Sequence, residues 1–190
     1  MVDQPSGSQI PVVQTGTEPT VNISETPGSE IAVSPDADEM QGWKTLTTNY
    51  FKVRHPSDVK SVNWGSMIYS LEKWGPTQQE DAEFYDGISI RFQVKEINDL
   101  NAEQYAKNKI EETKKQQIAD IVQELKPMTL RLSKGFTYTS SGLGIHRYYI
   151  FQVGKIDDAM ILEITDSTVD PTNQGYQTTV NKILNTLEIY

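Results

Sequence analysis

The chain has 190 residues, a one-domain length, and a net charge of −9. It contains no cysteine, which excludes disulfides, thiolate nucleophiles and Cys-ligated metal centres. Its apolar runs are far shorter than the roughly 18 residues that cross a bilayer, and no signal peptide opens the sequence, so we expect no membrane insertion by this segment.

The first 42 residues differ in composition from the rest of the chain. They hold seven acids, five of the nine prolines, no Lys or Arg and no aromatic residue. Such a segment buries too little apolar area to offset the loss of chain entropy, so residues 1–42 are predicted to form a disordered, flexible, acidic Pro/Ser/Thr-rich linker. In an alternative interpretation, residues 11–13 and 30–33 form strands that pair only with a partner or a neighbouring subunit.

The folded domain is predicted to begin at Trp43, the first aromatic residue, and to span residues 43–190. This part of the chain carries a net charge of only −2. Because it has no basic surplus, neither nucleic acid nor anionic lipid is an expected partner.

Strands are predicted in the first half of the domain, where short β-branched and aromatic runs are separated by Asn, Pro and Gly turns. The clearest is the last, in which Ile88, Ile90, Phe92 and Val94 alternate with polar residues and so define one buried face. The predicted strands are residues 43–47, 50–55, 66–74 and 88–94.

A long helix is predicted next, over residues 101–125. Asn101 provides an N-cap with Gln104 three residues later, and Pro127 closes the segment. The apolar residues assigned to one helix face are Tyr105, Ile110, Ile118, Ile121, Val122 and Leu125.

Further strands and a closing amphipathic helix complete the domain. The predicted elements are strands at residues 129–133, 136–139, 145–153 and 159–164, the last reached by a turn at 155–158, and a helix at 176–187. Strands follow one another here instead of alternating with helices. The fold class is therefore predicted as α+β, an antiparallel sheet covered by helices.

Two segments resemble a known family. Residues 43–60, Trp-Lys-Thr-Leu-Thr-Thr-Asn-Tyr-Phe-Lys-Val-Arg-His-Pro-Ser-Asp-Val-Lys, resemble the opening of PsbP-like domains, where a strand ends in an aromatic-Pro-Ser-Asp-Trp-type turn. Residues 176–190 resemble the last helix and short closing strand of these domains. The resemblance extends over residues 43–190 and implies a central antiparallel β-sheet sandwiched by α-helices (α/β/α).

The resemblance also implies a function and a location. Domains of this superfamily serve as protein-binding accessories instead of enzymes, among them extrinsic photosystem II subunits, a Ran-binding import factor and bacterial envelope lipoproteins. A proline-rich linker before such a domain resembles the tether of an envelope lipoprotein. We therefore expect an extracytoplasmic domain, in the bacterial periplasm or at the cell surface, with a signal or membrane anchor removed from upstream.

The residues themselves indicate no catalytic site and no cofactor. His55 and His146 are far apart in the sequence, and neither a Gly-x-Ser-x-Gly elbow nor a Walker-type phosphate loop accompanies them. The glycines of Gly142-Leu-Gly144 lack the third glycine of a dinucleotide loop. We expect ordinary structural roles for the two histidines.

No metal site is expected either. Asp166 and Asp170 have the spacing of a calcium loop, but the Gly and Glu that an EF-hand requires are missing, so helix capping is predicted instead. A second acidic cluster is predicted to be a solvated loop that does not hold a divalent ion. Its members are Glu80, Asp81, Glu83 and Asp86.

Four aromatic residues are the candidates for partner binding. Trp74 begins the acidic loop, Phe84 and Tyr85 lie near its end, and Trp64 lies in Val-Asn-Trp-Gly. Tryptophan and tyrosine dominate binding hot spots because they offer a large rigid area and one polar group. The alternative is that these rings pack onto the core.

Three functional hypotheses follow. The leading one is a non-catalytic extracytoplasmic accessory domain that recognises another protein and is tethered by the N-terminal linker. The second is a small-ligand or divalent-metal-dependent hydrolytic protein that uses residues 80–86 and His146. The third is a structural subunit of a cell-surface assembly, in which the linker orders against a neighbour.

Overall fold

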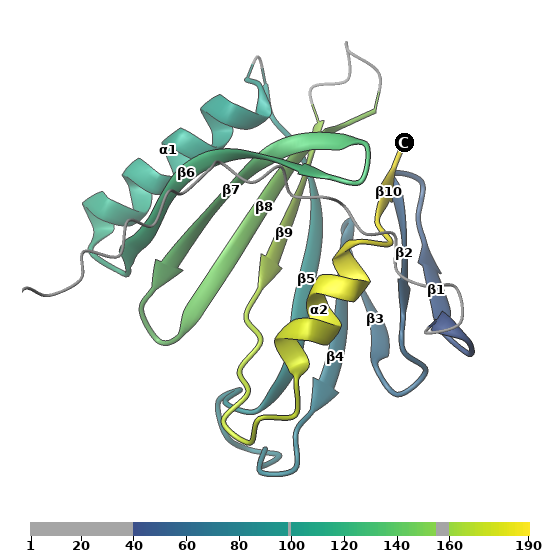
Figure 1. Ribbon diagram of the computed structural model, residues 1–190. Helices are drawn as coiled ribbons and strands as arrows, with labels where there is room; N and C mark the ends of the chain where they lie inside the picture. Colours follow the sequence, from purple (N-terminus) through teal and green to yellow (C-terminus); the bar gives the residue numbers. More distant parts are fainter. Residues whose placement is uncertain (1–39, 99, 155–159) are drawn as a thin grey trace, which may run out of the picture. The chain divides into compact units, whose positions relative to one another are not determined.

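The computed structural model describes residues 40–98, 100–154 and 160–190 (Figure 1). All but the last three residues of the linker predicted over 1–42 lie outside this description, as do the alternative strands at 11–13 and 30–33. The turn predicted at 155–158 lies outside it as well. The linker and its boundary with the domain therefore stay predictions.

Strands dominate the described part of the chain. They are β1 (Lys44–Thr47), β2 (Phe51–His55), β3 (Lys60–Gly65), β4 (Ile68–Trp74), β5 (Gly87–Glu96), β6 (Asp120–Leu130), β7 (Ser133–Ser141), β8 (Ile145–Val153), β9 (Met160–Asp166) and β10 (Glu188–Ile189). The helices are α1 (Ala102–Gln116) and α2 (Tyr176–Leu184). Neither of these described helices is long and apolar enough to span a membrane.

Within the described residues, seven strands form a large sheet in the order β3-β4-β5-β9-β8-β7-β6, and every neighbouring pair is antiparallel. After β5, helix α1 carries the chain to the far edge at β6, and the meander β6 to β9 returns it to β5. The strands β1, β2 and β10 form a small antiparallel sheet with β2 in the middle.

The two faces of the large sheet carry separate apolar cores, because successive residues of a strand point to opposite faces. On β9, Ile161 packs with the residues of α1, whereas Leu162 and Ile164 pack with those of α2. Helix α1 lies against β6, β7 and β8 (Figure 1). The helices therefore cover opposite faces, and the predicted α+β fold with a sandwiched antiparallel sheet is confirmed.

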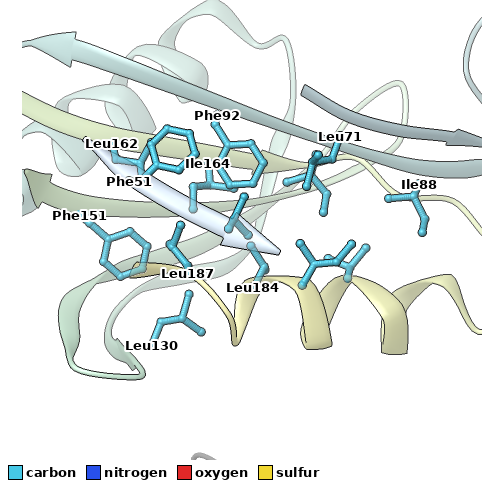
Figure 2. Packing of buried hydrophobic residues seen from close by; sticks show 14 of the residues in the cluster. Phe51, Leu71, Ile88, Phe92, Leu130, Phe151, Leu162, Ile164, Leu184 and Leu187 are labelled. Carbon is cyan, nitrogen blue, oxygen red and sulfur yellow. The ribbon is translucent and has the colours of Figure 1, made fainter. Parts of the chain in front are cut away.

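The larger core lies between α2, the small sheet and the large sheet (Figure 2). Phe51 of β2 stacks on Phe92 of β5 with ring centroids 5.1 Å apart, and it meets Tyr69 of β4 edge to face. Val180 and Ile183 of α2 are fully buried in the same core. Burial of these apolar side chains holds the small sheet against the large one.

The helix predicted over residues 101–125 is wrong beyond residue 116, because α1 ends before Gln117. Gln117 has a φ of 53°, a left-handed conformation that terminates the helix. Ile121 and Leu125 instead lie in β6, where they pack beside the core under α1. Pro127 belongs to the same edge strand, where a missing backbone N–H is tolerated.

Two other predictions differ from the structure. The strand predicted at residues 66–74 is β4, but Ser66 and Met67 form the turn of a hairpin with β3, a strand that the sequence did not predict. Residues 129–133 are not a strand of their own, since they contain the end of β6, a turn and the first residue of β7. Neither turn contains the Asn-Gly or Asp-Gly pair that usually signals a hairpin.

A buried ionic cluster joins α1 to the large sheet. The carboxylate of Glu163 on β9 lies 2.6 Å from Nζ of Lys109 and 3.2 Å from Nζ of Lys95, and it accepts a hydrogen bond from the Tyr105 hydroxyl at 2.8 Å. Burial alone would raise the pKa of Glu163, but the two ammonium groups and the hydroxyl hold it below its usual value. Burial lowers the pKa of Lys109, an effect that Glu163 opposes.

Replacing Gln117 with Gly is expected to raise the free energy of unfolding, measured by urea denaturation, by about 0.5 kcal/mol or more. The reason is that Gly adopts a positive φ without the steric penalty of a side chain. The matched change Gln116→Gly, inside the helix, is expected to lower it by about 1 kcal/mol. A loss of stability in both variants would indicate that the helix continues past Gln117.

Glu163→Gln is expected to lower the free energy of unfolding by about 3 kcal/mol near neutral pH, because Lys109 and Lys95 lose their buried counter-charge. The pKa of Glu163 is lower in the folded than in the unfolded protein. The contribution of Glu163 to the free energy of unfolding is therefore complete at a pH above 4.5, the ordinary pKa of a glutamate, and is lost as the pH falls below that value. Urea denaturation across this range should show the two proteins converging in acid.

The control for this prediction is Glu103→Gln, which removes the exposed pair with Lys107 on α1. Its expected effect is no more than about 0.5 kcal/mol, since solvent screens that pair. Equal losses in the two variants would contradict a special role for the buried cluster.

Candidate interaction face

Strands β3, β4 and β5 present a face that α2 does not cover. Leu71 and Ile90 are cross-strand neighbours that point into the core beneath α2, so the next pair, Ser70 and Arg91, points away from it. Helix α1 packs on β6, β7 and β8, in the other half of the sheet. We name this surface the open face; its side chains are Lys60, Val62, Trp64, Ser70, Glu72, Trp74, Ser89, Arg91 and Gln93.

The indole of Trp64 is 64% exposed, and yet it is held in position. Its Nε1–H donates to Oγ of Ser70 at 2.8 Å, and the Ser70 hydroxyl donates to Oε1 of Glu72 at 2.6 Å. Ser70 is only 5% exposed although it points to the open face, which indicates that the indole lies over it. Trp64 therefore offers its ring to solvent in a fixed orientation, which reduces the entropy lost when a partner covers it.

The hairpin that carries Trp64 ends in a strained turn. The register shifts at a β-bulge between Asn63 and Gly65, and Gly65, Ser66 and Met67 have φ values of 76°, 48° and 62°. A positive φ costs a non-Gly residue roughly 1 kcal/mol or more. Because a bulge re-aims the extra side chain, this backbone is what turns Trp64 onto the open face.

Trp74 is the second tryptophan of the open face and is 55% exposed. It follows Ser70 by four residues on β4, a separation of about 13 Å along the strand. Phe84 and Tyr85 lie in the β4–β5 loop, where Phe84 is half-buried and Tyr85 is exposed. The structure thus places Trp64 and Trp74 on one surface and the other two candidates on the loop that adjoins Trp74.

The β4–β5 loop is tied together at its base by Asp86, which is fully buried. Oδ2 of Asp86 accepts hydrogen bonds from the backbone N–H of Thr77 at 2.9 Å and from its hydroxyl at 2.6 Å, while the Asp86 carbonyl accepts from Gly75 at 2.9 Å. The Tyr85 hydroxyl donates to the carbonyl of Thr77. These bonds give the loop a defined shape next to Trp74.

The other acids of this loop, Glu80, Asp81 and Glu83, are exposed. Among the described residues, no group of three or more His, Asp or Glu side chains is placed to hold a metal ion. The structure therefore does not gather Asp86 and the exposed acids into the site that the hydrolytic hypothesis requires.

The two histidines lie on different sides of the large sheet. His55 is buried and shares the inward face of β2 with Phe51, in the core under α2; its Nδ1–H donates to the carbonyl of Pro56 at 3.0 Å. His146 shares the opposite face with Tyr148, and its Nδ1 lies 2.7 Å from Oγ of Ser167. The two rings are separated by the sheet and do not form an acid–base pair.

The capping role predicted for the segment at Asp170 is confirmed. Its carboxylate accepts hydrogen bonds from the N–H groups of Gly175 at 2.8 Å and Tyr176 at 3.1 Å, at the start of α2. Burial alone would raise the pKa of Asp170, but these backbone donors, with that of Gln174, hold it below its usual value. Asp166 is fully buried and accepts instead from the side chain of Gln177 at 3.0 Å.

One solved structure shares this architecture at the level of fold. The solution structure of cyanobacterial PsbP from Synechocystis matches with a TM-score of 0.51 over 78% of this chain and 93% of its own, at 7% sequence identity. This domain has a PsbP-like fold. A protein from Bacteroides thetaiotaomicron matches with a TM-score of 0.39 and 15% identity over 78% of this chain and 49% of its own, so the chain spans about half the length of that protein.

The sequence by itself does not reveal these relationships to a search. No family model matches it, and no curated protein matches it. The PsbP-like resemblance is nevertheless confirmed as a likeness of fold.

Sequence reasoning missed the polar residues of the open face. Ser70 and Glu72 alternate with the buried Leu71, and Arg91 alternates with Ile90 and its buried neighbours. This alternation was recognisable on β5, where it already implied that Arg91 faces away from the core. The link from Trp64 to Ser70 was not recognisable, because it depends on the bulge in β3.

Ser70→Ala is expected to release the indole of Trp64, since it removes the hydroxyl between Trp64 and Glu72. In proton–nitrogen NMR spectra, one of the three tryptophan indole signals should move, and the free energy of unfolding should fall by about 1 kcal/mol. Ser89→Ala, on the same face of β5, should leave all three signals in place. Unmoved signals in Ser70→Ala would mean that the relay does not hold Trp64.

Proposed function

We propose that this chain is a non-catalytic accessory domain that recognises another protein through its open face. The observation that supports this function is the exposed indole of Trp64, held by Ser70 and Glu72, with Trp74 on the same surface. Large rings that are exposed and already oriented are typical of binding hot spots, because a partner gains apolar area without ordering a flexible side chain.

The polar residues around the two rings favour a protein as the partner. Arg91 is exposed next to Ser70, and Glu72 lies on the adjacent cross-strand pair with Ser89. Arginine is enriched at protein interfaces, where its planar donors pair with carboxylates and carbonyls around an aromatic centre. The PsbP-like fold supports the same reading, since accessory domains of this superfamily bind other proteins.

The location we propose is extracytoplasmic, with residues 1–42 as the linker to an upstream signal or anchor. This proposal depends on the composition of the linker and on the fold. A tethered domain meets its partner at a high effective concentration, so a small interface that contains two tryptophans is sufficient for function.

The experiment is capture on the immobilised full chain, with detergent-solubilised envelope and cytosolic extracts of the source cells compared side by side. We expect a protein from the envelope extract to bind. Trp64→Ala and Trp74→Ala should each weaken its binding about 30-fold, as hot-spot residues do. Trp74→Ala should keep the free energy of unfolding within about 0.5 kcal/mol, because its ring is exposed. Trp64→Ala should lower it by about 1 kcal/mol, because it also removes the hydrogen bond to Ser70.

The matched control is Leu143→Ala, which removes an apolar side chain that is 95% exposed in the β7–β8 turn. It should leave capture unchanged. If every captured protein binds the three variants equally, the open face is not the recognition surface. If the partner comes only from the cytosolic extract, the proposed location is wrong.

A further inference from the structure

A groove with a volume of about 310 Å³ lies on the small sheet, on the side away from the large sheet. Phe51 and Val53 of β2 point inward to the core, so Lys52 and Arg54 point outward into the groove. Its other walls come from distant parts of the chain: Met40, Thr45, Arg131, Asn185, Thr186 and Glu188.

The groove is positively charged although the chain as a whole is acidic. It contains three cations, Lys52, Arg54 and Arg131, against the single carboxylate of Glu188, whereas the whole chain carries −9. Arg131 reaches the groove from the β6–β7 turn, where its backbone has a φ of 52°. A concave site lined by one sign of charge attracts and orients ligands of the other sign.

Glu188 shows how this site holds a carboxylate. Its two oxygens lie 2.6 Å from Nζ of Lys52 and 3.0 Å from Nη1 of Arg131. The hydrogen bond and the charge of Lys52 lower the pKa of Glu188, and Glu188 in turn raises the pKa of Lys52. One carboxylate of the chain itself therefore occupies one part of the groove.

Arg54 occupies the rest of the groove and is available to a ligand. Its Nη2 donates to the carbonyl of Met40 at 2.9 Å, and this acceptor carries no charge. Among the described residues, no carboxylate lies within ion-pair distance of Arg54. A planar guanidinium pairs with a carboxylate through two parallel hydrogen bonds.

We propose that this groove binds an extended acidic segment of another polypeptide, whose carboxylates pair with Arg54 and with Lys52 and Arg131. The spacing favours an extended chain. Lys52 and Arg54 are two residues apart on one strand face, about 7 Å, which is also the distance between alternate side chains of an extended peptide. This site is separate from the open face and goes beyond the function proposed there.

The test is fluorescence anisotropy with the full chain and a labelled peptide of alternating Glu and Thr, against the same peptide with Gln in place of Glu. Only the Glu peptide is expected to bind. Arg54→Gln should weaken binding about tenfold, as expected for the loss of a charge-assisted hydrogen bond. Glu188→Gln should strengthen it several-fold, because this change removes the competing carboxylate and frees Lys52 and Arg131.

Lys107→Gln is the matched control, since it removes one exposed positive charge from α1, over the other side of the large sheet. It should leave affinity unchanged, and so should Trp64→Ala. If Arg54→Gln and Lys107→Gln weaken peptide binding equally, the binding depends only on the net charge of the domain and the proposal is overturned. Inorganic phosphate and sodium chloride should also be compared as competitors at equal ionic strength. If phosphate displaces all of the peptide and chloride displaces none, the groove binds small anions and the peptide assignment is overturned.

Discussion

The width of the large sheet determines how much of its surface the helices of this domain can cover. An α-helix is about 10 Å wide and neighbouring strands lie about 4.8 Å apart, so one helix covers two or three strands. On the face opposite α2, the described residues supply α1 alone, and it packs on β6, β7 and β8. The ionic cluster around Glu163 ties α1 to β9, the central strand, and to Lys95 at one end of β5. Among the described residues, no helix packs on β3, β4 or the rest of β5 on this face.

The side chains of the uncovered half go beyond what solubility requires. A sheet face left to solvent needs nothing more than polar side chains, yet this one carries two exposed tryptophans, and the relay through Ser70 to Glu72 orients one of them. The turn at Ser66 and Met67 stores backbone strain beside that ring. The β3–β4 hairpin accounts for this conformation, because a two-residue hairpin turn ordinarily has a positive φ at both central residues.

Sequence patterns predicted the strands and helices whose apolar residues recur at a strict period. They failed at the places where the backbone conformation of a single residue ends or turns an element. The alternation in β5 and the helical spacing around Val180 follow directly from burial, so both elements were predicted correctly. The end of α1 and the β3–β4 turn depend on positive φ at Gln117 and Ser66, residue types that give no such signal. Residues four apart share one face of a helix and also one face of a strand, so the spacing of Ile121 and Leu125 did not distinguish the two; in β6 both pack beside the core under α1. The groove was equally invisible, since Arg54 and Arg131 come together only through the fold.

The layering of the domain keeps its two proposed contact surfaces apart. The open face lies on the side of the large sheet away from α2, whereas the groove lies on the outer side of the small sheet, which packs over the α2 side. Two packed sheets are about 10 Å apart, so one flat partner cannot cover both surfaces. Their chemistry differs as well: salt screens charge pairing at Arg54 far more than it affects burial of Trp64. The two proposals therefore predict different responses to ionic strength: added salt should weaken binding at the groove well before binding at the open face.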